Sequence, residues 1–376
     1  MVSLERGAGA SVSVFERAEA LLEHLAQHRV DVVVAAGELA DNACPALLRQ
    51  IQLRHPQVIR VVVTDRDASE VFRRVPYAHQ FFERSAPASA LGRAVAQCMD
   101  VKSLLGRTEL RALVSSSNAL PAAPKLYAQL IDLLADPRCS MLKVVSVIER
   151  DVGMSTRLMQ LVSSAFFGLS TQITSLGACV GYLGLEAIRS LVLSAEISQL
   201  YPGSVPGLSA ERIHARALAT SRLARRLASN VADEGHAFIA GLLHGVGQLV
   251  LASRAPQKLT EALELGAARG LSQADAEQEV IGATSAHVGA YLLALWGQPL
   301  GVVRAIAYQD LPEICDGSSI GLATIVYLGK RLSQNSDVVL GPPSTAVDAL
   351  NEPFLARVGA LESLPRFRDV ARRLVP

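Results

Sequence analysis

The residue types that carry out chemistry are few and widely spaced in this chain. It contains no GxxxxGK(S/T) loop, no GxGxxG between a strand and a helix and no GxSxG elbow, the motifs that bind phosphates or present a serine nucleophile. Its five cysteines form no CxxC pair: Cys44, Cys98, Cys139, Cys179 and Cys315. A dispersed, odd-numbered set of this kind indicates buried reduced thiols rather than a metal or redox site.

His244 is a histidine with two interpretations. It ends an apolar run and is followed by Gly245 and Gly247. One interpretation is a ligand or a nucleotide contact. The other is a helix-end histidine satisfied by neighbouring backbone groups, with the two glycines turning the chain. The second is favoured because it is the commoner role of such a residue.

Arginines on one predicted helix form a second candidate. Arg212 and Arg216 lie four residues apart, as do Arg222 and Arg226, so each pair shares a helix face. Such pairs can contact the phosphates of a nucleotide or nucleic acid. A solvated helix face has the same pattern, and the sequence favours that interpretation.

The composition limits the classes of partner and compartment. The 376 residues include 36 basic and 35 acidic ones, for a net charge of +1, and half of the residues are hydrophobic. This balance excludes wholesale disorder and gives no reason to expect nucleic acid as a partner. No run of 18 apolar residues occurs, and the first residues lack the basic and apolar regions of a secretory signal. We therefore expect a cytoplasmic protein without a membrane span.

The elements that must position these residues divide the chain into two kinds of structure. Over the first 105 residues, β-rich runs (11–14, 30–35, 58–64 and 78–83) alternate with helical ones (15–28, 43–54, 68–75 and 87–105). This alternation predicts a small α/β domain with a parallel sheet, in which 30–35 is a strand covered on both faces. The helix over 87–105 is expected to be a rigid connector.

After about residue 105 the pattern is almost wholly helical. Predicted helices include 141–150, 155–166, 175–182, 185–200, 211–232, 236–243 and 286–296. The expected domains are therefore an α/β domain with its connector over 1–105, an all-α domain over 106–311, and a helical extension over 312–376 packed on the all-α domain.

The α/β part resembles a truncated, flavodoxin-like receiver domain of response regulators. The resemblance rests on Asp31-Val-Val-Val-Ala-Ala-Gly-Glu-Leu39 and on Ala78-His-Gln-Phe-Phe82. It places Ala36 at the phospho-acceptor position and Thr64 and Arg84 at the two switch positions. Phosphorylation needs a carboxylate nucleophile and a Mg²⁺ site, and alanine has no side-chain oxygen. The resemblance thus implies a receiver that cannot be phosphorylated.

The helical part is similar to an HDOD domain, a degenerate relative of the HD phosphohydrolases. The similarity rests on the order and spacing of several segments: Leu120-Pro121, Ile148-Glu-Arg-Asp151, Leu161-Val-Ser-Ser-Ala-Phe-Phe-Gly168, Ile173-Thr-Ser-Leu176, Tyr182-Leu-Gly-Leu185, Ala237-Phe-Ile-Ala-Gly-Leu-Leu-His-Gly-Val-Gly-Gln-Leu249 and Val288-Gly-Ala-Tyr-Leu-Leu-Ala-Leu-Trp-Gly297. It implies an all-α fold of a family that has usually lost the catalytic ligands of the HD phosphohydrolases.

The resemblance also implies which residues replace the metal ligands. Arg216 stands at the first histidine position, with His214 two residues away, and His244-Gly245 replaces the His-Asp pair. A later histidine position falls near Ser285, with His287 two residues on, and Lys330 replaces the distal aspartate. Metal-dependent hydrolysis needs clustered imidazoles and carboxylates. Arg216, His244 and Lys330 are therefore candidate residues of a degenerate site, for which we expect neither a metal nor a cofactor.

Three functions follow from these features. The leading hypothesis is a non-enzymatic bacterial signalling regulator that acts through protein–protein contacts. The resemblance implies signalling proteins as its partners, including those of cyclic-dinucleotide or motility pathways. The alternative is a module that holds a nucleotide in the degenerate site, and the third is an active metal-dependent phosphohydrolase. The first receiver strand is missing by this resemblance, which leaves a sheet edge to be covered. A second protomer, in a homodimer, and the N-terminal arm are the two candidates for that cover.

Overall fold

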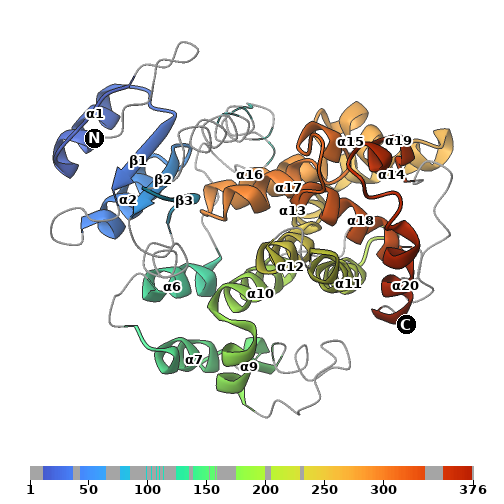
Figure 1. Cartoon of the computed structure of the whole chain (residues 1–376), viewed down its shortest axis with the longest axis horizontal. Helices are drawn as coiled ribbons and strands as arrows, with labels where there is room; N and C mark the ends of the chain where they lie inside the picture. Colours follow the sequence, from blue (N-terminus) through green and yellow to red (C-terminus); the bar gives the residue numbers. More distant parts are fainter. Residues whose placement is uncertain are drawn as a thin grey trace. The chain divides into compact units, whose positions relative to one another are not determined.

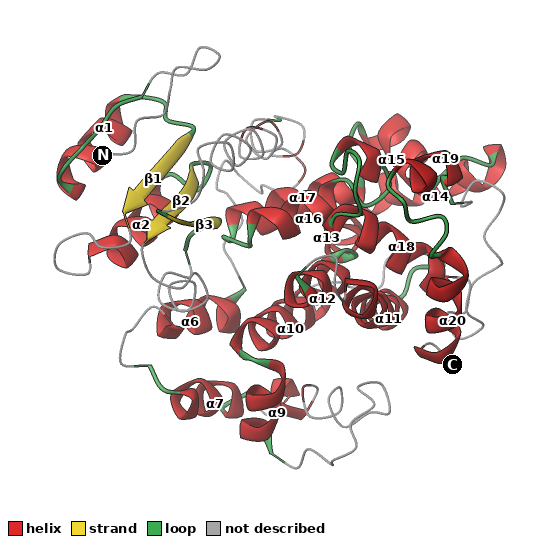
Figure 2. Ribbon diagram, viewed as in Figure 1, coloured by secondary structure: helices red, strands yellow, loops and turns green. Residues whose placement is uncertain are grey.

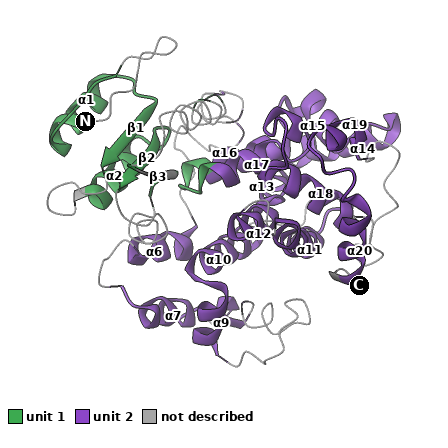
Figure 3. Cartoon of the chain, in the orientation of Figure 1, with its two compact units in different colours: residues 1–106, 294–300 green, residues 107–293, 301–376 purple. Residues whose placement is uncertain are grey.

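The computed structural model describes ten stretches of the chain: 12–36, 43–64, 77–84, 124–134, 139–151, 153–156, 175–199, 205–228, 233–334 and 350–374, with isolated positions at 99, 103, 107, 110, 113 and 158. The chain divides into two compact units (Figure 3). The first consists of Met1–Gly106 together with Ala294–Leu300, and the second of Arg107–Leu293 and Gly301–Pro376. Strands occur in the first unit, and the described part of the second is helical (Figure 2).

A small parallel sheet forms the centre of the first unit (Figure 1). Its strands β1 (Val32–Ala36), β2 (Ile59–Thr64) and β3 (Gln80–Glu83) are neighbours in that order, with Val34 opposite Val61 and Val63 opposite Phe82. All six residues of β2 are buried, as expected for a central strand rich in β-branched residues. In β1, by contrast, Val34 is 40% exposed, so the prediction that both faces of this strand are covered is wrong for the described residues.

Two helices accompany the sheet in the described part of this unit. They are α1 (Ala18–Gln27) and α2 (Ala43–Arg54). The strand predicted at 11–14 is wrong over its described residues, because 12–14 form an irregular segment in which Val12 and Val14 are 53% and 73% exposed. The helix predicted at 68–75, and nearly all of the connector predicted at 87–105, lie outside the described residues.

The second unit is built from helices along most of its described length. They are α6 (Lys125–Leu134), α7 (Met141–Glu149), α9 (Leu176–Leu183), α10 (Leu185–Gln199), α11 (Ala210–Ala228), α12 (Glu234–Leu243), α13 (Val246–Arg254), α14 (Pro256–Arg269), α15 (Gln273–Ile281), α16 (Ser285–Leu295), α17 (Leu300–Ala307), a short 3-10 turn (Pro312–Ile314), α18 (Leu322–Gln334), α19 (Glu352–Arg357) and α20 (Leu364–Leu374). Residues 294–300, at the end of α16 and the start of α17, belong to the first unit.

Local sequence explains where several of these helices begin and end. The Asp233 carboxylate accepts hydrogen bonds from the backbone N–H groups of Gly235 and His236 and so begins α12. The Ser272 hydroxyl does the same for α15, and Gly282 ends that helix with a φ of +80°, a conformation that favours glycine.

The core of the second unit is built around α11 and α12. Gly241 of α12 approaches α11 so closely that a Cβ atom at this position would lie 2.6 Å from the Cα of Ser221. The C-terminal helices share one apolar core with α11, α12 and α18, a core that includes Leu223, Leu328, Phe354 and Leu364. The described part of the C-terminal segment is therefore packed on the helical unit.

One long apolar stretch of the second unit, Glu234–Arg254, spans α12 and α13. It is long and apolar enough to cross a membrane, but most of it is buried within the unit, as in the core helix of a soluble protein. The helices Leu176–Leu183 and Leu185–Gln199 reach such a length only as a pair, and that pair is bent by 113°.

The close approach of α11 and α12 predicts the effect of one added methyl group. Gly241→Ala should destabilise the protein by about 1–3 kcal/mol, because the new Cβ must displace backbone atoms of α11. Gly181→Ala in α9 is the matched control: its Cβ would meet no atom within 4 Å, and alanine is the better helix former. Urea denaturation of both variants measures the difference. A Gly241→Ala protein as stable as Gly181→Ala would contradict this packing.

Candidate functional site

His244 lies at the turn between two core helices. It is the C-cap residue of α12, and Gly245 begins the turn into α13. The side chain is 6% exposed. A Cβ atom on Gly245 would come within 2.9 Å of the Ile213 side chain on α11, so the turn is pressed against that helix. The core therefore fixes the position of this histidine.

The imidazole of His244 is bonded to the backbone of its own helix. Its Nδ1 lies 2.7 Å from the Gly241 carbonyl oxygen, so Nδ1 carries the proton in the neutral ring and Nε2 has the free electron pair. Burial lowers the pKa of His244 to about 3, and the positive charges of Lys330 and Arg216 act in the same direction, while the Gly241 carbonyl and Asp310 oppose them. His244 is thus neutral at physiological pH, in the arrangement that the helix-end interpretation describes.

Beside this ring, a carboxylate is held by two cations. Lys330 Nζ lies 2.7 Å from Asp310 Oδ1, and Arg331 Nη2 lies 3.6 Å from the same oxygen. All three side chains are at most about one-fifth exposed. Burial alone would raise the pKa of Asp310, but the charge and hydrogen bond of Lys330, helped by Arg331, hold it below its ordinary value. Asp310 is therefore ionised and paired.

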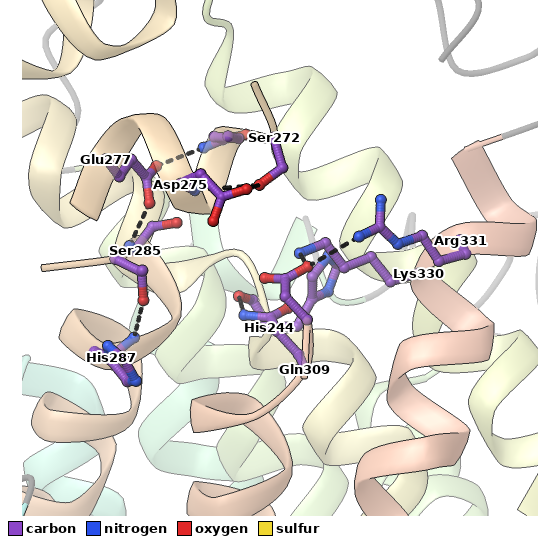
Figure 4. Close-up of polar contacts among 12 residues, drawn as sticks. His244, Ser272, Asp275, Glu277, Ser285, His287, Gln309, Lys330 and Arg331 are labelled. Carbon is purple, nitrogen blue, oxygen red and sulfur yellow. Dashed lines mark hydrogen bonds and ion pairs between the residues drawn. The ribbon is translucent and has the colours of Figure 1, made fainter. Parts of the chain in front are cut away.

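A glutamine connects the carboxylate to the histidine turn. Gln309, which is 2% exposed, donates from Nε2 to the His244 carbonyl oxygen at 3.1 Å. Its Oε1 is buried and has no hydrogen-bond partner among the described residues. In Figure 4, Gln309, His244, Lys330 and Arg331 come together from the α12–α13 turn, the segment after α17, and α18.

A second polar group lies at the start of α16 (Figure 4). Glu277 of α15 is fully buried; its carboxylate accepts the Ser285 backbone N–H at 2.5 Å and the Gln273 side-chain amide at 2.6 Å. Burial raises the pKa of Glu277, and those hydrogen bonds oppose the shift. Two residues after Ser285, His287 Nδ1 lies 3.3 Å from Arg107 Nη1. The Glu277 carboxylate thus caps the N-terminus of α16.

Arg216, His244 and Lys330, the candidate site residues identified from the sequence, lie close enough for their charges to interact. The charges of both Arg216 and Lys330 act on the His244 ring. His287 also senses the Asp310 charge, although its own contact is with Arg107. Within the described stretches of chain, no three histidine, cysteine, aspartate or glutamate side chains cluster so that they could hold a metal ion.

The three positions that the receiver resemblance identified lie at the same end of the sheet. Ala36 is the last residue of β1, Thr64 is the last residue of β2, and Arg84 follows β3 directly. The Arg84 backbone N–H donates to the Thr64 carbonyl oxygen at 2.9 Å. Ala36 and Arg84 are exposed, whereas Thr64 is 1% exposed. All three lie at the carboxyl ends of parallel strands, the usual place of a functional site in such sheets.

The comparison with protein families decides the identity of the helical part. Residues 120–312, more than half of the chain, match the HDOD domain family. The chain belongs to the HDOD family. The HDOD resemblance drawn from the sequence motifs is thereby confirmed, and the match includes His244, Gln309 and Asp310.

Known structures share the HDOD fold with this chain at low sequence identity. An HDOD domain protein of unknown function from Geobacter sulfurreducens is 20% identical, with a TM-score of 0.51, over 73% of this chain and 99% of that one. A protein provisionally named a phosphohydrolase from Shewanella amazonensis SB2B is 21% identical, with a TM-score of 0.55, over 72% and 95%. One provisionally named a signal transduction protein from Marinobacter aquaeolei VT8 is 21% identical, with a TM-score of 0.52, over 95% and 84%.

A relative among curated proteins matches only in part. It is an uncharacterized protein of Treponema pallidum (strain Nichols), 23% identical over 243 residues, which are 62% of this chain. This HDOD chain spans about half, 47%, of the length of that relative.

Sequence reasoning missed Asp310, Gln309 and Arg331. Asp310 stands alone after an apolar helix, and its partners come from α18, beyond the residues that match the HDOD family. The signal that was available is the adjacent pair Lys330-Arg331 in an otherwise apolar helix, because a buried cation requires an acid.

The Asp310–Lys330 pair predicts a large effect of removing one partner. Lys330→Met should destabilise the HDOD chain by about 3 kcal/mol at neutral pH, because it leaves the Asp310 carboxylate buried with Arg331 as its remaining cation partner. The double variant Asp310→Asn/Lys330→Met should recover much of that loss. Urea denaturation of both single variants and the double variant gives the coupling energy. Additive losses would show that the pair contributes nothing.

The buried neutral His244 predicts acid sensitivity of folding. In the unfolded chain it binds a proton near pH 6.5, but in the folded chain only near pH 3. The unfolded state therefore binds more protons below pH 6.5, and stability falls as the pH decreases. His244→Asn should reduce the slope of stability against pH by up to about 1.4 kcal/mol per pH unit between pH 6 and 4.

Denaturation at several pH values measures this slope. His28→Asn, which replaces an exposed histidine of the first unit, is the matched control for the loss of a histidine. A slope that is the same in His244→Asn and in the parent protein would refute the buried neutral state of His244.

Proposed function

We propose that this HDOD chain is a non-enzymatic bacterial regulator that acts in the cytoplasm through contacts with other signalling proteins. The observation that carries the proposal is the position of the Lys330 ammonium, which is bonded to Asp310 beside His244. By the HDOD resemblance, Lys330 stands where an HD hydrolase has its distal aspartate, and its ammonium pairs with Asp310. The fold is then kept for its surfaces, and its chemistry is lost.

The chemistry of the donor set does not fit a catalytic metal centre. A divalent ion that activates water needs several imidazoles and carboxylates arranged around it. At this position His244 offers one free nitrogen, the Asp310 oxygen is taken by Lys330 and Arg331, and the Arg216 charge also acts on the ring. The positive charges of Lys330, Arg331 and Arg216 would repel an incoming divalent cation. We therefore derive no metal-dependent step.

The first unit is proposed to be a receiver-like domain that takes no phosphoryl group. The parallel order β1-β2-β3 supports this, as does the gathering of Ala36, Thr64 and Arg84 at the carboxyl ends of the strands. Ala36 offers no oxygen as an acceptor. Input to such a domain would come from a binding partner, and a second copy of the chain is one such partner, because β1 pairs only with β2 among the described strands.

One observation favours a second function, a module that holds a nucleotide. The buried Gln309 Oε1 has no partner among the described residues and can accept a hydrogen bond from the amino group of a base. Arg216 and Lys330, whose charges act at the same site, suit a phosphate. On this hypothesis the nucleotide is bound without being hydrolysed.

The proposed regulator predicts that the protein neither binds a catalytic metal nor hydrolyses nucleotides. Protein purified in the presence of Mn²⁺ should contain well under one equivalent of metal by elemental analysis, with no turnover of cyclic dinucleotides or (p)ppGpp. The control restores the family ligands as Arg216→His/Gly245→Asp/Lys330→Asp, which should bind more Mn²⁺ than the parent protein. Stoichiometric metal or turnover in the parent protein would overturn the regulator.

Calorimetry with cyclic dinucleotides separates the two proposed functions. Binding that disappears in Arg216→Ala/Lys330→Ala would establish the nucleotide module in place of the regulator. No binding by the parent protein, or equal binding by the parent and the double variant, would remove the nucleotide from this site.

A further inference from the structure

Residues 294–300 belong to the α/β unit although they lie inside the HDOD match. The match covers 120–312, whereas Ala294–Leu300 cluster with the first unit (Figure 3). Helix α16, which runs from Ser285 to Leu295, therefore starts in the helical unit and ends in the α/β unit. It is a single structural element shared by both.

His79 binds both ends of this inserted segment. Its Nε2 lies 2.8 Å from the Ala294 carbonyl oxygen, and its own carbonyl accepts the Leu300 backbone N–H at 2.8 Å. The Arg60 backbone N–H donates to His79 Nδ1 at 2.9 Å, so Nδ1 carries no proton and Nε2 carries the proton donated to Ala294. The Arg60 backbone N–H of β2 thus favours the His79 tautomer with its proton on Nε2, which is the tautomer that can donate to Ala294.

The surroundings keep the His79 ring neutral. The side chain is 1% exposed and lies beside Arg60, which is fully buried. The Arg60 guanidinium donates to the carbonyl oxygens of Tyr77 at 2.7 Å and Val58 at 2.9 Å. Burial and the Arg60 charge both lower the pKa of His79. Arg60 is the charged group that acts on the ring among the described residues, so the donated proton is a fixed feature of the fold.

These contacts serve as a cap for α16. The last carbonyl groups of a helix have no donor within the helix, and side chains commonly supply one. Here His79 supplies Ala294, and Gln52 of α2 supplies Leu295 at 3.5 Å. Gly297 follows the helix with a φ of +75°, a conformation that favours glycine, and the chain turns there before α17 begins at Leu300.

The other end of α16 is fixed just as closely to the His244 turn. The Glu277 carboxylate caps Ser285 at the first residue of the helix. Gly247, three residues after His244, touches α16 so closely that a Cβ atom there would lie 1.8 Å from the Ser285 carbonyl oxygen and 2.5 Å from the Gly289 nitrogen. The turn that carries His244 is thus followed directly by a backbone contact with α16.

We propose that α16 is the output element of the α/β unit: His79 and Gln52 clamp its C-terminal end, and release of that clamp loosens the His244 turn at its N-terminal end. The proposal rests on the regulatory function proposed above, and it identifies α16 as the element that connects the α/β unit to the His244 turn. The two states are a closed clamp, with residues 294–300 on the α/β unit, and an open clamp, with that segment released. A partner that binds the two states with different affinity would shift the population between them.

The chain contains its own probe for the clamp. Trp296 is the single tryptophan of the sequence, lies in the clamped segment and is 6% exposed. Its fluorescence reports release of the segment, and hydrogen exchange of peptides covering 285–300 and 244–249 reports both ends of α16 in the same full-length protein. Neither readout depends on metal binding or activity, so hydrolysis by this chain would overturn the proposed function but leave this test intact.

The decisive variant is His79→Ala, with the exposed His28→Ala as its control. In His79→Ala the Trp296 emission should shift to the red, and exchange over 285–300 and over 244–249 should accelerate about ten-fold, the effect of one lost buried hydrogen bond. The control should match the parent protein. Unchanged Trp296 emission in folded His79→Ala would overturn the clamp. A red shift with unchanged exchange over 244–249 would overturn the transmission.

If His79→Ala does not fold, a second pair of variants, which removes a weaker contact of the same segment, provides the test. Gln52→Ala removes the donor to Leu295, and Gln50→Ala changes an exposed glutamine of the same helix. Faster exchange at both ends of α16 in Gln52→Ala alone would support the proposal. Equal exchange in the two variants would overturn it.

Discussion

The close approach of helix backbones at glycine is the constraint on which the second unit depends. Gly241 lets α12 touch α11, and Gly247 lets the start of α13 touch α16. His244 lies between these two glycines, so its place is determined on both sides by backbone packing. Arg216 lies on α11, the helix that packs against Gly241, and its charge therefore acts on the His244 ring. The site geometry therefore follows from the core itself.

Charge is balanced inside this core by protein groups. The buried Asp310 carboxylate is paired with Lys330 and Arg331, and burial keeps the nearby imidazole neutral. In metal hydrolases a bound ion would compensate the carboxylate. Here two side chains of α18 do so permanently, and they tie the segment after α17 to that helix.

Sequence patterns predicted the features that depend on local periodicity and missed those that depend on distant partners. The apolar runs located β1 and β2, and the glycines after His244 indicated a helix-end histidine bonded to its own backbone. The strand predicted at 11–14 failed because alternation alone does not supply a pairing partner. Asp310 was missed because nothing near it in the sequence shows that Lys330, twenty residues later, will neutralise it.

The division of the first unit into 1–106 and 294–300 has a consequence for biosynthesis. When residue 106 leaves the ribosome, His79 has neither the Ala294 carbonyl nor the Leu300 amide to bind, because both are still to be made. At 5–20 residues per second the nascent chain waits roughly 10–40 seconds for them. During that interval most of the HDOD helices emerge. The amino-terminal unit is thus begun first, and it is completed only after residues 294–300 have been made.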